Sequence, residues 1–483
     1  MRTRRRAGWR LSHLLAVGLI AGTVVNVVMG DAVPIAARAA NAAGHSGSWT
    51  VYHGDAAGSG ASGAIGAVDT SAAAWTSPVL DGQLYGEPLV SSGDVFVATQ
   101  NDTVYALSTS TGRVIWSTHV GPPVPASALP CGDISPTVGI TGTPVIDQSR
   151  NELFVVADEL ANGHPVHKLV GLNSSSGAIE LAENVDPPGA DAAALLQRTG
   201  LTLDAHQVVF AMGGNYGDCG TYRGTVVAVK ESGAPPTYFT VDAATGESQG
   251  AIWMGGAAPE VDRHGNVWVS AGNGSVHAAD QPYDDSDSAL ELSSSLRLVQ
   301  FFAPATWAQD NAQDQDLSTA PALLGDGQVL VAGKSRVLYL LNGAHLGGIG
   351  GEEASLGSPC SEDIDGGDAV VGDVVYLPCL SGTEAVRVTA DPAALRILWR
   401  SPQGGGPPIV AAGLIWTIGQ NGTLYGLDRT SGAVRQQASI GAPENHFPTP
   451  SVGGGLLLAP AADRVVAFHA PSPARTSHSG GRT

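Results

Sequence analysis

The sequence has few basic residues and, in particular, almost no lysine. Lys and Arg together number 24 among 483 residues, against 44 Asp and Glu, and lysine occurs only at positions 168, 230 and 334. Proteins that bind nucleic acid need clustered Lys and Arg to contact phosphates, so the formal net charge of −20 argues against a nucleic-acid partner. Charged residues are also scarce overall, at 14%, but 43% hydrophobic residues provide enough apolar surface to exclude a disordered chain.

Long uninterrupted helical segments are missing as well. The chain contains 64 Gly and 30 Pro, which interrupt it throughout. This content is too rich in turn-forming residues for a helical protein. It indicates many short strands joined by turns.

Several of the scarce arginines lie close to the N-terminus. Arg2, Arg4 to Arg6 and Arg10 precede an apolar run from Leu14 to Met29, and residues 37–39 have the A-x-A spacing of a cleavage site. We therefore predict a secretory signal peptide over residues 1–39 and a secreted or cell-envelope location. The alternative is an uncleaved membrane anchor, because the run approaches spanning length. Without residues 1–39 the chain has 18 basic and 43 acidic residues, a net charge of about −25.

Cysteine is rare but even in number. The four residues are Cys131, Cys219, Cys360 and Cys379. Export to an oxidising compartment predicts that they form two disulfides. Three pairings are possible, of which Cys131–Cys219 with Cys360–Cys379 is the most economical, since the second pair flanks one short hairpin-like segment. No C-x-x-C, no haem-attachment site and no adjacent pair of cysteines occurs.

A repeated phrase of strand, Gly-containing turn and strand runs through the body of the chain. Residues 104–116 show it in full, with a Thr-Gly turn and a closing Trp116, and weaker copies occupy residues 170–177, 241–246 and 424–432. Trp116, Trp307 and Trp399 are interpreted as the ends of such units. The units begin near residues 83, 139, 198, 251, 315, 365, 405 and 445. A spacing of about 45 to 50 residues fits four short strands and their turns, as in a propeller blade. The fold class predicted is an all-β, eight-bladed β-propeller of four-stranded antiparallel blades.

The ends of the chain complete this prediction. The last unit, residues 447–468, has room for only three strands, and residues 73–79 can supply the missing outer strand. Such an N-terminal strand closes the ring and removes an exposed edge. We thus expect a signal peptide over 1–39, a lead-in segment over 40–72, one propeller domain over 73–470 and a disordered tail over 471–483, in a protein that is monomeric.

With these units in view, the sequence resembles a known family. The phrase A-L-x-x-x-T-G-x-x-x-W at residues 106–116 is similar to the docking motif of the PQQ-repeat, or quinoprotein alcohol dehydrogenase-like, β-propellers. Residues 49–63 also resemble the lead-in of secreted members, so the resemblance spans about residues 49–470. The superfamily includes pyrroloquinoline quinone (PQQ) and calcium-dependent dehydrogenases. It also includes non-catalytic propellers such as the lipoprotein of the bacterial outer-membrane assembly machinery.

The resemblance assigns roles to particular residues. Residues 267–275 are similar to the segment whose Asn ligates calcium, which here is Asn273, and residues 310–316 resemble H-D-x-W-D-x-D. The latter places Asp314 at the catalytic carboxylate, and Asp316 directly beyond it would share in binding the metal. Gly333-Lys334 resembles the segment whose Lys contacts the quinone, and Trp253 corresponds to the Trp on which the quinone stacks.

The position of the family's calcium-ligating Glu differs. Cys219 stands near it, and Asp218 could replace that Glu only if the loop shifts by one residue. The adjacent-cysteine disulfide that covers the quinone in many family enzymes is missing. Asp314 and Asp316 could instead form an exposed acidic turn, Asn273 could cap a tight turn, and Lys334 could pair with a surface carboxylate.

Two functions follow from these observations. The first is a secreted propeller that binds a small ligand at its central funnel, with PQQ and Ca²⁺ as cofactors and alcohol oxidation as its chemistry. The alternative is a non-catalytic propeller that binds a cell-envelope protein. A membrane would be a partner only if the N-terminal segment stayed uncleaved.

One further acidic cluster invites a calcium interpretation. Asp280, Asp284, Asp285, Asp287 and Glu291 lie close together in the sequence. The EF-hand pattern does not fit, because Pro282 stands at the third loop position and Asp285 where glycine is needed. We therefore expect a solvated loop or a weak, incidental calcium site.

Overall fold

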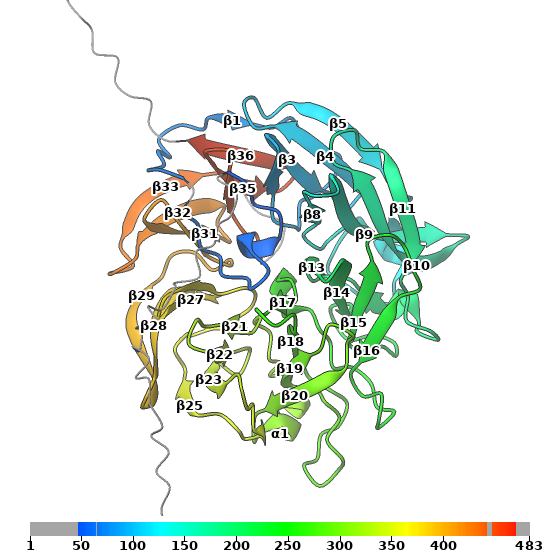
Figure 1. Cartoon of the computed structure of the whole chain (residues 1–483), viewed down its shortest axis with the longest axis vertical. Coiled ribbons are helices and arrows are strands. Elements are labelled where there is room, and N and C mark those ends of the chain that lie inside the picture. The colour runs from blue at the N-terminus through cyan, green and yellow to red at the C-terminus, as the bar shows by residue number, and fades with distance from the viewer. Residues whose placement is uncertain (1–46, 64, 442–446, 470–483) are drawn as a thin grey trace, which may run out of the picture. The chain divides into compact units, whose positions relative to one another are not determined.

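The computed structural model of the chain describes residues 47–63, 65–441 and 447–469. The expected signal peptide and C-terminal tail lie outside the described residues. Within these ranges the chain forms eight sheets of four or five strands arranged around a ring (Figure 1), and a small two-stranded sheet between two of them. The predicted eight-bladed propeller is therefore confirmed. None of the helices in the described part is long and apolar enough to cross a membrane.

Each of the first four blades is built mainly from consecutive antiparallel strands. Blade 1 contains β2 (Leu89–Ser91), β3 (Asp94–Ala98), β4 (Thr103–Ser108) and β5 (Val114–His119). Blade 2 contains β8 (Val145–Asp147), β9 (Glu152–Ala161), β10 (His164–Asn173) and β11 (Ile179–Asn184). Blade 3 contains β12 (Leu195–Leu196), β13 (Thr202–Asp204), β14 (Gln207–Gly214), β15 (Thr225–Lys230) and β16 (Thr237–Thr240). Blade 4 contains β17 (Glu260–Val261), β18 (Val267–Ala271), β19 (Ser288–Leu292) and β20 (Leu298–Ala303), with β24 (Gly348–Ile349) added parallel at its edge.

The remaining blades follow the same order around the ring. Blade 5 contains β21 (Ala322–Leu323), β22 (Gln328–Val331), β23 (Val337–Asn342) and β25 (Ala354–Gly357). Blade 6 contains β26 (Ala369–Val371), β27 (Val374–Cys379), β28 (Gly382–Ala390) and β29 (Ala393–Ser401). Blade 7 contains β30 (Ile409–Ala411), β31 (Leu414–Gly419), β32 (Thr423–Asp428) and β33 (Val434–Ser439). Blade 8 contains β34 (Ser451–Gly453), β35 (Leu456–Ala461), β36 (Arg464–His469) and the N-terminal β1 (Trp75–Thr76).

A few short elements lie between the blades. They are η1 (Tyr52–Gly54), β6 (Val124–Pro125), η2 (Ala126–Ala128), β7 (Thr137–Val138), η3 (Ala192–Ala194), η4 (Met254–Gly256) and α1 (Trp307–Gln313).

The ring closes as the sequence predicted. Trp75 pairs with Ala467 and Thr76 with Val466, so β1 becomes the outer strand of a blade that otherwise has three strands. The closing strand comes from the opposite end of the chain (Figure 1). Unfolding the last blade therefore also requires release of the N-terminal strand.

The repeated glycines and tryptophans hold neighbouring blades together. The indole N–H of Trp116 donates to the carbonyl oxygen of Ser174 at 3.1 Å, and a Cβ on Gly177 would lie 2.5 Å from the Trp116 ring. Gly177 has a φ of +71°. The turn glycine thus satisfies a backbone conformation and also leaves room for the Trp of the preceding blade. Trp75 and Trp399 dock in the same way, donating to Thr109 and Arg429 at 2.7 and 2.9 Å.

Trp307 was also expected to end a unit, and here the sequence interpretation is wrong. Trp307 is the first residue of α1, and its ring packs edge-on against Tyr283 at 5.0 Å. No Thr-Gly or Ser-Gly turn follows it to form the docking surface of a next blade. This tryptophan anchors α1 to the loop before β19.

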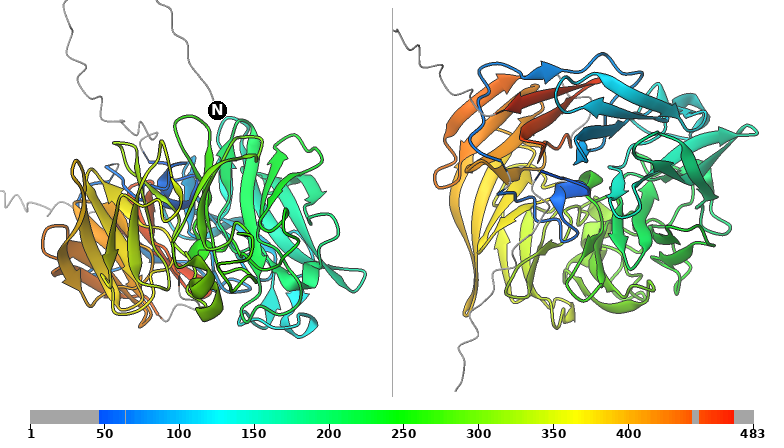
Figure 2. Two further views of the ribbon diagram at one scale, coloured as in Figure 1. Left: turned by 90° about the horizontal axis from the view of Figure 1, so that it is seen from below. Right: turned by 45° about the horizontal axis from the view of Figure 1, so that its top comes forward.

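The lead-in segment enters the centre of the ring (Figures 1 and 2). The backbone N–H of His53 in η1 donates to Oε2 of Glu87 in blade 1 at 2.8 Å. The Tyr52 hydroxyl accepts from the N–H of Gly367, next to blade 6, at 3.3 Å. Tyr52 and His53 stack at 4.3 Å and are buried. The segment η1 therefore joins residues next to blade 1 to residues next to blade 6.

The four cysteines form two disulfides. The pairs are Cys131–Cys219 and Cys360–Cys379, with sequence separations of 88 and 19. This is the most economical of the three pairings that the sequence allowed. The longer bridge joins the connection between blades 1 and 2 to the β14–β15 loop of blade 3.

Candidate functional site

Asp316 lies at the centre of a cluster formed by blades 4 and 5. It follows α1, and its side chain is 4% exposed. The backbone N–H of Asn273, which follows β18, donates to its Oδ1 at 2.6 Å. Nζ of Lys334, which follows β22, lies 2.6 Å from its Oδ2. Both oxygens of this buried carboxylate are therefore bound by groups of the protein.

Two glycines allow the carboxylate to be enclosed so closely. A Cβ on Gly272 would lie 2.6 Å from Oδ1 of Asp316, and a Cβ on Gly333 would lie 1.8 Å from its carbonyl oxygen. A side chain at position 272 would displace the Asp316 carboxylate, and one at position 333 would require the backbone at Asp316 and Leu317 to move. Close packing against Asp316 thus explains why glycine precedes both Asn273 and Lys334 in the sequence.

Lys334 joins Asp316 to the surface. Its Nζ also lies 2.9 Å from Oδ1 of Asp314, whose side chain is 64% exposed and whose φ of +56° ends α1 in the left-handed region. Burial opposes the charge of Lys334, but the carboxylates of Asp316 and Asp314 raise its pKa above the ordinary value. The exposed acidic turn that the sequence offered as an alternative describes Asp314 but not Asp316.

Trp253 stands next to this ion pair. It directly precedes η4, and Nζ of Lys334 lies 5.7 Å from the centroid of its ring, within the range of a cation–π contact. The ring centroid of Phe447 lies 5.8 Å from that of Trp253, at an interplanar angle of 52°. The two residues to which the sequence gave quinone-binding roles, Trp253 and Lys334, are thus neighbours.

Arg198, at the start of blade 3, is a member of this region that the sequence analysis missed. Its Cζ lies 5.7 Å from the ring centroids of both Tyr85 and Phe447, and its Nη1 donates to the carbonyl oxygen of Thr141 at 3.0 Å. Arg198 is 7% exposed, and its Nη2 has no hydrogen-bond partner among the described residues. Burial lowers its pKa. The only sequence signal was a lone Arg at the start of a repeat unit in a chain poor in basic residues.

Asp218 does not join the cluster directly. Its Oδ1 accepts the hydroxyl of Tyr222 at 2.6 Å, in the loop that Cys219 ties to Cys131. Burial and the charge of Asp218 raise the pKa of Tyr222, and the more distant Asp316 and Asp314 raise it further. Asp218 therefore has one oxygen bound by Tyr222 and lies in a loop that is tied to the connection between blades 1 and 2.

The predicted calcium ligands do not fit the metal in this arrangement. Calcium needs carboxylate oxygens that are free to face it, with other oxygens or water completing its coordination, and no cation among them. Both oxygens of Asp316 are bound by Asn273 and Lys334, one oxygen of Asp218 is bound by Tyr222, and the Lys334 ammonium lies between Asp314 and Asp316. Among the described residues the one close group of three acidic, His or Cys ligand atoms is Cys360, Cys379 and Glu384, where both cysteines form a disulfide. We derive no step through calcium at this position.

A buried acid near the cluster makes stability depend on pH. Burial is the main cause that raises the pKa of Asp365 to about 7; Asp363 and Asp316 add to the rise, while Lys334 and the hydrogen bond from Ser318 oppose it. The folded protein therefore keeps this proton to a higher pH than the unfolded chain does. The stability contributed by the neutral acid is fully present below the ordinary pKa of about 4 and is lost as the pH rises to about 7.

Asp365→Asn tests this dependence, because the amide imitates the neutral acid at every pH. The original protein loses this stability as the pH rises, and the variant does not. We therefore expect the stability of the variant minus that of the original protein to be about 2 kcal/mol larger at pH 8 than at pH 5. Urea unfolding at both pH values measures it. An equal difference in the free energy of unfolding between the variant and the original protein at pH 5 and at pH 8 would contradict the raised pKa of Asp365.

Comparison with known proteins agrees with the fold. Residues 36–286 match the sequence model of a family described as outer membrane protein assembly factor BamB. The solved structure of quinohemoprotein alcohol dehydrogenase ADHIIG from Pseudomonas putida HK5 is similar, with a TM-score of 0.66 and 13% identity over 88% of this chain and 82% of that chain. No curated protein sequence matches the chain.

Two further solved structures resemble it. Quinohemoprotein alcohol dehydrogenase from Comamonas testosteroni has a TM-score of 0.65 and 14% identity, covering 90% of this chain and 82% of that chain. BamB from Moraxella catarrhalis has a TM-score of 0.55 and 14% identity, covering 83% of this chain and 100% of that chain. Because the identities are low, these likenesses show the shared fold.

Proposed function

Since the chain belongs to the PQQ-repeat β-propeller family, we propose that it binds a planar, anionic small molecule at the centre of its ring, between Arg198 and Lys334. The observation that carries this proposal is a row of four groups: Arg198, Phe447, Trp253 and Lys334, each within 5.8 Å of the next. Two aromatic rings lie between two cations. Such a row offers stacking surfaces to a flat ligand, an unpaired guanidinium at one end, and at the other end an ammonium that Asp314 and Asp316 already bind.

The state of Arg198 supports a ligand rather than a structural role. Burial of a cation without an ion-pair partner is unfavourable. Within the described ranges no carboxylate forms an ion pair with Arg198, and its Nη2 is unpartnered and buried. A carboxylate on a bound molecule would supply the missing acceptor in bidentate form.

PQQ fits these requirements, because it is flat and carries several carboxylates. Arg198 and Lys334 would bind its acidic groups, and Trp253 would provide a stacking surface. When bound, PQQ supplies a quinone that accepts two electrons. Lys334 is already held by Asp316 and Asp314, so this chain orients its cation without calcium.

A binding experiment with PQQ as the probe tests the proposal. Titration in EDTA, followed by tryptophan fluorescence and calorimetry, should show binding that CaCl₂ does not strengthen. Arg198→Met and Trp253→Ala should each weaken it at least about tenfold, as expected for loss of a charged hydrogen bond or a stacking surface. Arg263→Met, on an exposed turn of blade 4, is the matched control and should bind as the original protein does.

Arg198→Met has a second readout that a structural role would not give. Removing an unpaired buried cation should raise the free energy of unfolding of the ligand-free protein, while the affinity for PQQ falls. Failure of PQQ to bind, or unchanged affinity in both Arg198→Met and Trp253→Ala, would refute the proposed function.

Alcohol oxidation is a second candidate function, and the position of Asp314 favours it. The carboxylate is 64% exposed beside Lys334, at the place to which the resemblance gives the catalytic acid. An exposed carboxylate could accept the proton of an alcohol. Reduction of a dye by alcohols in the presence of PQQ, abolished in Asp314→Asn, would establish this activity. Binding of PQQ without turnover would leave the protein a non-catalytic binder.

A further inference from the structure

The loop between β18 and β19 differs from its sequence-based description. Asp284 and Asp287 are 1% and 0% exposed, so the expected solvated loop is wrong for both. Asn311 of α1 holds this loop in place, accepting from the N–H of Gly274 at 2.9 Å and donating to the hydroxyl of Ser286 at 2.9 Å. The loop is therefore packed against α1, with acidic side chains inside.

A second buried acid meets this loop from the end of blade 3. Asp242 is 1% exposed, and its backbone N–H donates to the carbonyl oxygen of Asp284 at 3.1 Å. Its φ is +65°, a left-handed conformation that non-glycine residues rarely adopt. The backbone therefore holds Asp242 against the loop at a conformational cost.

Three carboxylate oxygens of these two residues lack partners. Among the described residues, no group donates to either oxygen of Asp242 or to Oδ2 of Asp284. Oδ2 of Asp284 lies 2.5 Å from where a Cβ of Gly274 would be, and Oδ2 of Asp242 lies 3.7 Å from the corresponding place on Gly250. Gly250 and Gly274 belong to segments that pair through a bridge between residues 249 and 274. Both carboxylates thus face the same pair of segments.

The surrounding charge is strongly negative. Burial, then Asp284, raises the pKa of Asp242 to about 8, and Asp285 and Glu247 contribute in the same direction. The nearby cation, Arg223, opposes this rise, but its guanidinium donates to the backbone oxygens of residues 246 and 247. Unpartnered, buried carboxylates in such a field require either protons or a cation.

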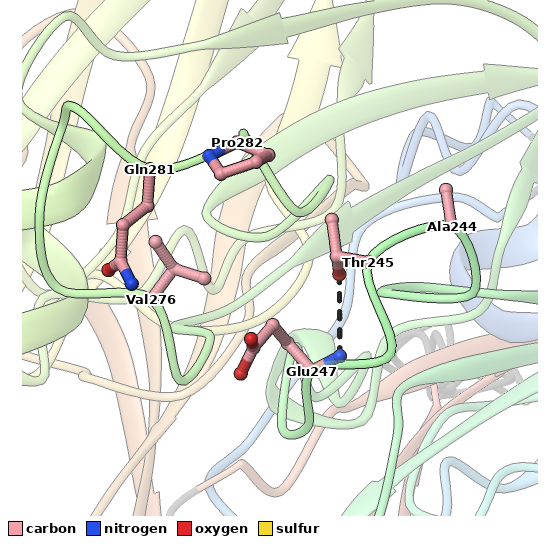
Figure 3. Close-up of a pocket in the computed structure, with 6 residues that line it drawn as sticks. All are labelled: Ala244, Thr245, Glu247, Val276, Gln281 and Pro282. Atoms are coloured by element: carbon pink, nitrogen blue, oxygen red, sulfur yellow. Dashed lines mark hydrogen bonds between the residues drawn. The ribbon is translucent and has the colours of Figure 1, made fainter.

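A cavity lies beside the two segments that carry these acids, although neither Asp242 nor Asp284 lines it. It has a volume of about 310 Å³ and lies between the turn that begins at Asp242 and the loop that leads to Asp284. Its lining residues are Ala244, Thr245, Glu247, Val276, Gln281 and Pro282 (Figure 3). The side chains of Glu247 and Gln281 extend from its two sides (Figure 3). The cavity is large enough for hydrated ions to enter.

We propose that Asp242 and Asp284 bind a hard divalent cation, Ca²⁺, that fastens the β18–β19 loop to blade 3. Oxygen-only ligands and two carboxylates are typical of sites for this class of ion. No three acidic or His ligand atoms gather here within 4.8 Å among the described residues, so backbone oxygens and water must complete the coordination. This site is separate from Asp314, Asp316 and Asn273, and it does not depend on the proposed ligand.

Calcium binding to EDTA-treated, dialysed full-length protein tests the proposal. Calorimetry with CaCl₂ at pH 7.5, with metal analysis after dialysis, should show one bound ion per chain. Saturating CaCl₂ should raise the Tm by about 3 °C or more. Asp242→Asn and Asp284→Asn should each abolish both effects. MgCl₂ in a parallel titration shows whether the smaller ion competes.

Two other variants locate the site. Asp280→Asn changes an exposed carboxylate of the same loop and should leave calcium binding unchanged. Asp314→Asn tests whether calcium instead binds at the position that the family resemblance suggested, and it should leave calcium binding unchanged. Absence of calcium binding in the original protein, its persistence in both Asp242→Asn and Asp284→Asn, or its loss in Asp314→Asn would each overturn the proposal. Near-UV circular dichroism confirms that the variants are folded.

Discussion

Replacing Lys334 by methionine is expected to lower the free energy of unfolding by about 3 kcal/mol, because it leaves a buried carboxylate without its cation. The side chain of Asp316 is 4% exposed, and that of Lys334 is 22% exposed. Methionine keeps much of the volume of the lysine stem but removes the ammonium group. Asp316 would then have to take up a proton or remain charged while buried without its cation, and both are unfavourable near neutral pH.

The double variant Lys334→Met/Asp316→Asn separates this effect from lost packing. An asparagine at 316 can still accept the N–H of Asn273 through its side-chain oxygen, but it needs no counter-charge. We expect the double variant to recover more than half of the loss, as neutral replacement of a buried pair is often tolerated. Lys230→Met, at one of the other two lysines and exposed, should stay within about 0.5 kcal/mol.

Urea unfolding of the three variants, with the disulfides intact, gives the comparison. Equal losses in the Lys334→Met and double variants would show that packing, not charge, is the contribution of Lys334. A loss below about 1 kcal/mol in the single variant would contradict the burial of the pair, since exposed ion pairs contribute only about that much.

The blade count was predictable because local and long-range requirements coincide in the repeat. A glycine such as Gly177 is needed for its own positive φ and, at the same time, for the Trp of the preceding blade. A single sequence motif therefore predicts both a turn and a contact between neighbouring blades. Trp307 shows the limit of this reasoning. A tryptophan without a matching turn glycine has no docking partner, and it packed against Tyr283 instead.

The site was predictable only in part. Asn273 and Lys334 could be found because each follows a glycine that the close packing around Asp316 requires, and Asp316 lies in the acidic segment 310–316 that resembles the family pattern. Arg198 could not, because its environment consists of Tyr85 and Phe447, and no local pattern connects residues so far apart in the chain. The burial of Asp284 could not be predicted from the sequence either. Its loop is acidic by composition, and only the contact of Asn311 with Gly274 shows that it turns inward.

The other large effect is expected for the disulfide between Cys131 and Cys219. The bridge closes a loop with a sequence separation of 88. In the chain-entropy treatment, opening a loop of this size lowers the free energy of unfolding by about 4 kcal/mol. Both cysteines are half-buried, so replacing them by alanine removes little packing. The variant Cys131→Ala/Cys219→Ala should also show a larger urea m-value, because its unfolded chain is less compact.

Partial reduction of the original protein provides the matched control. Cys360 and Cys379 are 2% and 0% exposed, whereas the first pair is accessible, so mild reductant should open Cys131–Cys219 first. Alkylation and mass spectrometry identify this species, and its stability should equal that of the double alanine variant. A loss below about 1 kcal/mol in both would contradict the entropic effect. The bridge also holds the loop in which Asp218 accepts the Tyr222 hydroxyl.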